Sequence, residues 1–182
     1  MRALVVFESM FGNTQEVAKA IADGLASRMT VDLVEVSAAP TVIDDGLDLL
    51  VVGGPTHAHG MSTPASRLSA ARRANQGLVS AGIGLREWLA AVRRGSASVA
   101  AAAFDTRIKG PGLLWGSAAR AADKELRRLG LRPVVAPESF LVSGPLGPVF
   151  DVVLEGEAER ARRWGEKLGS KLTAHERDRQ AS

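Results

Sequence analysis

From Leu4 to Thr14 the chain reads Leu-Val-Val-Phe-Glu-Ser-Met-Phe-Gly-Asn-Thr. An apolar run short enough for one strand stops at Glu8, a polar turn with one glycine follows, and Thr14 opens a helical pattern. Backbone N–H groups, two hydroxyls and a side-chain amide then surround a helix N-terminus at the carboxyl end of a strand. Because unpaired amides and the helix dipole both favour an anion, the stretch predicts a phosphate-binding turn. An ordinary strand-to-helix turn with a polar cap is the alternative interpretation.

Two well-known phosphate-binding turns do not fit this stretch. It has one glycine and no lysine before Thr14, so it is not a Walker A sequence. It also lacks the three glycines of the G-x-G-x-x-G dinucleotide turn.

Composition restricts the chemistry that the chain can perform. The 182 residues include no cysteine, which excludes disulfides, thiol redox chemistry and cysteine-ligated iron–sulfur clusters. Any redox role therefore requires a bound organic cofactor. No apolar stretch approaches the roughly 20 residues of a membrane span, and the N-terminus enters a strand without the pattern of a signal peptide. We therefore expect a cytoplasmic protein.

The chain is basic, with a formal net charge of +3 and most of its 23 basic residues being arginine. Such a charge can attract nucleic acid, an anionic membrane surface or an acidic partner. Few aromatic residues lie among the arginines for base stacking, and no nucleic-acid motif accompanies them. Solvated helix faces are the favoured interpretation, and no nucleic-acid partner is expected.

Short apolar, β-branched runs alternate with helical patterns along the chain, which is typical of a parallel sheet with crossover helices. The pattern predicts an α/β fold, a doubly wound five-stranded parallel sheet of order 2-1-3-4-5 with helices on both faces. Residues 1–173 are expected to form this domain and 174–182 a charged tail without regular structure. Strands are predicted over about 3–7, 31–36, 49–52 and 98–104 and within 131–143, interrupted near Pro137; helices are predicted over about 14–29, 64–74, 85–94, 117–129 and 154–172.

In such sheets a ligand lies beyond the carboxyl ends of the first, third and fourth strands. After the third strand the chain reads Gly-Gly-Pro-Thr-His-Ala-His-Gly-Met from Gly53 to Met61. Its His-x-His pair could hold zinc, although no cysteine and no third ligand lie within sequence reach, or the two histidines could simply face solvent. After the fourth strand comes Phe104-Asp105-Thr106-Arg107.

These three loops, in chain order, resemble those of flavodoxin-like FMN-binding proteins. Residues 9–14 are similar to the phosphate loop (S/T)-x-x-G-x-T, above all to that of flavodiiron proteins and tryptophan-repressor-binding-protein-type quinone reductases. Residues 53–61 resemble the second loop, G-x-P-T followed by x-x-G and Met or Asn. The resemblance covers residues 2–172. It implies FMN as the cofactor, with no metal and no catalytic side chain.

The resemblance also implies a role for each loop. Ser9, Asn13 and Thr14 would hold the ribityl phosphate with nearby amides, residues 55–61 would line one face and edge of the flavin, and residues 104–107 would meet the ring edge. A cation at Arg107 would stabilise the reduced, anionic flavin. The cofactor-binding residues implied are Ser9, Met10, Phe11, Gly12, Asn13, Thr14, Pro55, Thr56, His57, Ala58, His59, Gly60, Met61, Phe104, Asp105, Thr106 and Arg107.

The function that follows is FMN-dependent electron transfer or reduction of a small acceptor such as a quinone. Whether the chain is an FMN-dependent oxidoreductase is left open, and the sequence names neither redox donor, acceptor nor oligomeric state. The alternative is a flavodoxin-like interaction module that has lost FMN. Three features favour that alternative. Phe11 stands where many flavodoxins have a hydroxyl, His59 stands where the relatives often have an aromatic residue, and no tyrosine is present to stack on a flavin.

Overall fold

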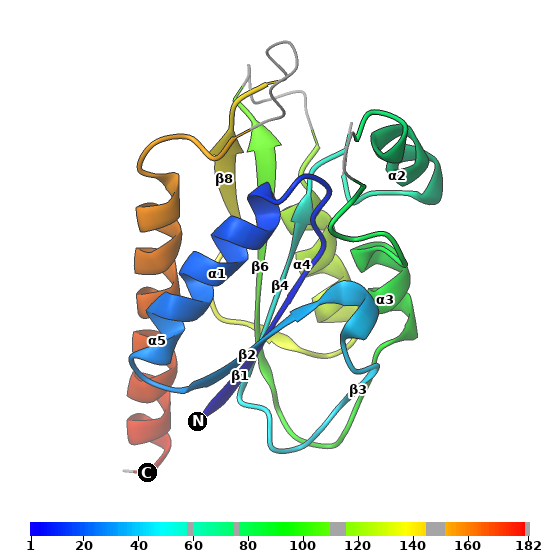
Figure 1. The fold of residues 1–182 in the computed structure, drawn as a ribbon. Coiled ribbons are helices and arrows are strands. Elements are labelled where there is room, and N and C mark those ends of the chain that lie inside the picture. Colours follow the sequence, from blue (N-terminus) through cyan, green and yellow to red (C-terminus); the bar gives the residue numbers. More distant parts are fainter. Residues whose placement is uncertain (58–59, 75–76, 110–115, 145–151, 181–182) are drawn as a thin grey trace.

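The computed structural model describes residues 1–57, 60–74, 77–109, 116–144 and 152–180, and at its centre lies one parallel sheet (Figure 1). The hydrogen-bonded order is β2-β1-β4-β6-β7, with β8 also paired to β6. The predicted order 2-1-3-4-5 is therefore confirmed, with the fifth position shared by two short strands. The strands are β1 (Arg2–Phe7), β2 (Thr30–Glu35), β4 (Leu49–Pro55), β6 (Ala100–Ile108), β7 (Arg132–Pro133) and β8 (Glu138–Val142).

The fifth strand is interrupted where the sequence predicts it. β7 pairs with the start of β6 at Ala100 and Ala101, whereas β8 pairs with its end, from Phe104 to Ile108. Pro137 lies between the two, and proline cannot donate a ladder hydrogen bond. β6 therefore keeps a neighbour at both ends.

Helices cover both faces of the sheet (Figure 1). On one face lie α1 (Asn13–Ala26) and α5 (Glu157–Gln180); on the other lie α2 (Pro64–Ala71), α3 (Leu85–Ala91) and α4 (Ala118–Arg128). Successive strand residues point to opposite faces, so Leu4 and Val6 join the core beneath α3 and α4, while Val5 joins the core beneath α1 and α5. In the described residues no helix is long and apolar enough to cross a membrane.

The ends of several predicted elements differ from the structure. α3 ends at Ala91 because Val92 is extended, and Arg93–Arg94 form β5, which pairs with β3 (Val42–Ile43). β6 continues as strand to Ile108, beyond its predicted end at about residue 104. α5 continues to Gln180, so residues 174–180 are helical rather than without regular structure. Extending an existing helix adds one hydrogen bond per residue without a new nucleation cost.

α1 and α5 pack through glycines on each helix. A Cβ atom at Gly24 would overlap the carbonyl oxygen of Arg162, and one at Gly165 would overlap the carbonyl oxygen of Ile21. The two backbones thus approach more closely than any side chain allows. This contact fixes α1, and with it the loop that precedes α1, against the sheet.

We predict that Gly165→Ala destabilises the fold by about 1–3 kcal/mol, the usual cost of overpacking, although alanine is the better helix former. Gly169→Ala is the matched control one turn later on α5. A Cβ there meets the Arg28 side chain at 3.2 Å, and that side chain can move. Urea denaturation of both variants measures the effect. Equal stabilities for the two variants would contradict the close packing of α1 on α5.

Candidate functional site

A cleft opens beyond the carboxyl ends of β1, β4 and β6. The three loops singled out in the sequence all contribute to it, so residues far apart in the chain meet at one place. Its lining residues are Ser9, Met10, Phe11, Asn13, Thr14, Pro55, Thr56, His57, Thr106, Arg107, Ile108 and Val142.

The first loop leaves the N-terminus of α1 without a side-chain cap. Gly12 precedes the helix with φ +98°, a left-handed conformation that favours glycine, and it has no side chain that could accept from the first-turn amides. The Ser9 hydroxyl accepts a hydrogen bond from the Gly12 N–H at 3.1 Å, which holds the turn closed. The positive end of the helix is therefore directed at the cleft.

The hydroxyls of Thr14 and Thr106 join the first loop to β6. Their oxygens lie 2.7 Å apart, and both residues are buried beside the cleft. Two hydroxyls carry two hydrogens and one hydrogen bond between them uses only one. The second hydrogen remains available to an acceptor in the cleft.

The second loop is closed by backbone hydrogen bonds. His57 and Gly60 exchange N–H···O bonds of 2.9 and 3.1 Å, and the Thr56 N–H donates to the Thr106 carbonyl at 2.8 Å. Burial, together with the positive charges of Arg73 and Arg67, lowers the pKa of His57, so its imidazole is neutral at pH 7. Ala58 and His59 lie outside the described residues, and with them the zinc alternative.

Three of the predicted residues lie beneath the cleft rather than in its lining. The Phe104 ring is fully buried and packs edge-on against Phe140 and Trp164. Met61 belongs to the core under α3 and α4. Asp105 is also buried, and its Oδ2 accepts hydrogen bonds from the Thr56 hydroxyl (2.9 Å), the Ser117 hydroxyl (2.6 Å) and the Ala119 N–H (2.9 Å). Asp105 thus positions Thr56 and the start of α4.

Two supporting residues of the first loop were not predicted from the sequence. Ser80 pairs with Ser9 through two hydrogen bonds. Its Oγ accepts from the Ser9 N–H at 2.9 Å, and its own N–H donates to the Ser9 carbonyl at 2.8 Å. The Val79 N–H donates to the Met10 carbonyl at 3.0 Å. The segment 75–84 carries only a loop-like composition, so nothing in the sequence marks this pairing.

Glu8 forms the centre of a buried polar network under the loops. The Ser62 hydroxyl donates to its Oε1 at 2.5 Å, and the Leu85 N–H donates to its Oε2 at 2.9 Å. The Arg67 guanidinium donates to Ser62 at 2.9 Å and to Glu87 at 3.1 Å. Burial raises the pKa of Glu8, against the opposing effect of these donors and of the Arg67 charge.

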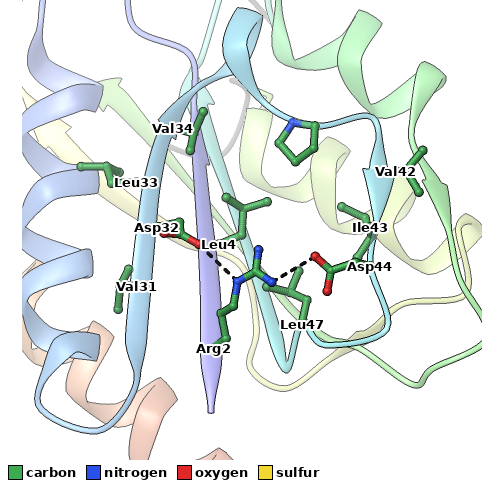
Figure 2. A pocket seen from close by; sticks show the side chains of 11 residues that line it. Arg2, Leu4, Val31, Asp32, Leu33, Val34, Val42, Ile43, Asp44 and Leu47 are labelled. Carbon is green, nitrogen blue, oxygen red and sulfur yellow. Dashed lines mark hydrogen bonds and ion pairs between the residues drawn. The ribbon is translucent and has the colours of Figure 1, made fainter.

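A second, larger hollow of about 330 Å³ lies over β1 and β2, beneath residues 40–47 (Figure 2). Only the short 3₁₀ helix η1 (Val36–Ala38) and β3 lie between β2 and β4 in the chain, so no α-helix connects these two strands. The Arg2 guanidinium in this hollow already forms ion pairs with Asp32 (3.2 Å) and Asp44 (3.1 Å). Its charge is neutralised, which makes the hollow a poorer site for an anionic cofactor than the cleft.

Comparisons with known proteins agree with this geometry. A family model described as flavodoxin matches residues 5–164. Comparison with curated protein sequences shows no match.

Solved structures show the same fold at low sequence identity. A flavodoxin from the domain Archaea superposes with TM-score 0.63 at 18% identity, covering 95% of this chain and 99% of that chain. A WrbA-like flavodoxin from Agrobacterium tumefaciens gives 0.58 at 16%, covering 96% and 98%. The flavodiiron core of Flv1 from Synechocystis gives 0.59 at 14%, covering 96% of this chain and 36% of that chain.

The Glu8 network yields a prediction on pH dependence. Because the folded-state pKa of Glu8 lies above its ordinary 4.5, the unfolded chain loses this proton first, and the free energy of unfolding falls as pH rises from about 4.5 through the raised value. In Glu8→Gln this decrease should be absent. Urea denaturation between pH 4 and 8 measures it, with exposed Glu16→Gln as the control. Parallel profiles for Glu8→Gln and the parent would refute the assignment.

Proposed function

The chain belongs to the flavodoxin family, and from this premise we propose that it binds FMN in the cleft and carries electrons or reduces a small acceptor such as a quinone. Bound FMN supplies the redox chemistry. The protein's own part is to bind the cofactor, orient it and set the charge around it.

The observation that carries the proposal is the uncapped N-terminus of α1 at the cleft. Its first-turn amides, the Ser9 hydroxyl and the spare hydrogen of the Thr14–Thr106 pair offer donors to a phosphate dianion. The donor set fits a phosphate group and no cation. Phe11, Pro55 and Ile108 provide apolar surface next to it for a ring system.

The charge of the cleft distinguishes the two redox roles. Residues 53–67 contain no Asp or Glu, and Asp105 is buried, whereas Arg107 lines the cleft. A cation at this place stabilises the negative charge that a flavin gains on reduction. A raised reduction potential suits reduction of a quinone-like acceptor better than low-potential electron donation.

The first test is cofactor binding itself. We expect the purified protein to be yellow or to quench FMN fluorescence on titration. A colourless protein that leaves FMN fluorescence unchanged would instead support the alternative, an interaction module that has lost FMN. Phe11 and the missing tyrosine favour that alternative.

The phosphate site is tested by replacing Ser9 and Thr14 with alanine together. Hydrogen bonds to charged groups are worth about 1.5–3 kcal/mol each, so the affinity for FMN should fall at least about tenfold. Riboflavin, which lacks the phosphate, should bind the variant and the parent alike. Ser27→Ala, at the far end of α1, controls for effects on the helix. Equal losses for both ligands would place the phosphate elsewhere.

The charge argument is tested by Arg107→Ala. Coulomb attraction at 4 Å is about 4 kcal/mol at an effective dielectric near 20, before solvent screening. If screening leaves about 1–2 kcal/mol, the two-electron potential of bound flavin should fall by roughly 20–40 mV. Potentiometric titration of the FMN-loaded protein measures the change, with exposed Arg120→Ala as the control. An unmoved potential would show that Arg107 does not face the ring.

A further inference from the structure

Two sets of arginines in this chain differ in their surroundings. On α4 and α5 they have acidic partners three or four residues away: Arg127 with Asp123 (2.9 Å), Arg128 with Glu125 (2.7 Å) and Arg162 with Glu159 (2.7 Å). These pairs match the solvated helix faces expected from the sequence. Their charges cancel locally.

The cations around the cleft form no ion pair with any described residue. They are Arg72, Arg73, Arg86, Arg107 and Lys109. Arg107 lines the cleft, and Arg86 lies against the second loop because its guanidinium donates to the carbonyls of Met61 (3.0 Å) and Ser62 (3.2 Å). Arg73 is near enough to His57 for its charge to act on that imidazole.

Few exposed acidic side chains lie near these cations, and Glu16 in the first turn of α1 is one of them. Between residues 53 and 94 the only acidic residue is Glu87, and its carboxylate forms an ion pair of 3.1 Å with the Arg67 guanidinium. Asp105 is fully buried. The described residues around the cleft therefore carry a net positive charge, and its field extends into solvent.

Exposed aliphatic side chains lie among the same cations. Leu68 is 56% exposed on α2, four residues before Arg72, and Ile108 is 45% exposed next to Arg107. Val79 is 40% exposed beside the first loop, to which its N–H is bonded, and Ile83 is 43% exposed just before α3. Of these four, Ile108 lines the cleft and Val79 is bonded to its first loop, while Leu68 and Ile83 lie on the segments that carry Arg72 and Arg86.

We propose that this cleft rim, formed by Leu68, Arg72, Arg73, Val79, Ile83, Arg86, Arg107, Ile108 and Lys109, docks an acidic protein. Complementary charge steers the encounter and suppresses wrong partners, while the aliphatic residues provide the apolar contact that protein interfaces bury. Nucleic acid fits less well, because the exposed apolar residues here are aliphatic and offer no ring for base stacking. The proposal rests on the proposed function only in making this partner the electron donor or acceptor.

The test uses a labelled acidic [2Fe–2S] ferredoxin as the probe and fluorescence anisotropy as the readout. Binding is measured first on FMN-free protein, so that a failure of FMN binding leaves the result readable. We expect binding in 50 mM salt and at least about a tenfold loss of affinity in 500 mM salt. Basic cytochrome c should not bind. Absence of ferredoxin binding would overturn the proposal.

Charge reversal localises the surface. Arg72→Glu with Arg73→Glu should weaken ferredoxin binding at least about tenfold. Arg93→Glu with Arg94→Glu changes the net charge equally at exposed positions on β5, away from the cleft, and should leave binding within about twofold. Equal losses in both variants would show attraction to net charge alone. A single-stranded oligonucleotide that binds as tightly as the ferredoxin would equally overturn the assignment to a protein partner.

Discussion

The carboxylate of Glu8 is the constraint on which the cleft depends. It has no exposed surface, and its two oxygens accept from two different segments, Ser62 after β4 and the Leu85 amide at the start of α3. A buried acceptor that loses its donor costs about 1–3 kcal/mol. The end of β1 therefore cannot move without the second loop and α3. Arg67 and Glu87 extend the same linkage to α2.

The sheet and the three loops could be predicted from the sequence because their signals are local. Strand ends are visible as apolar runs that stop, as at Glu8, and helix starts as caps, as at Thr63 with Pro64 and at Ser117. Once the order of parallel strands is known, their carboxyl ends must meet at one edge. That geometric necessity, rather than any single motif, brought Thr14 and Thr106 into contact.

The remainder of the site depends on contacts between distant segments. Glu8 is indistinguishable in the sequence from an exposed residue at a strand end, and its partners lie 54 and 77 positions away. Ser80 supports the first loop from a segment with no pattern of its own. Arg93–Arg94 continue a helical pattern, yet pairing with Val42–Ile43 satisfies their backbone groups better than a further helical turn. Periodicity reports which face is buried and does not report which partner buries it.

The short connection between β2 and β4 has a consequence for association between molecules. In the described part of the chain β2 pairs only with β1, so its outer edge presents free backbone donors and acceptors, while α1 packs against one of its faces. Asp32 lies in the middle of this strand and Glu35 at its end. A strand added from another molecule would lie beside these carboxylates, and charged side chains on an edge strand are a known protection against such pairing. The open edge of the sheet is thereby protected by charge against pairing with another molecule.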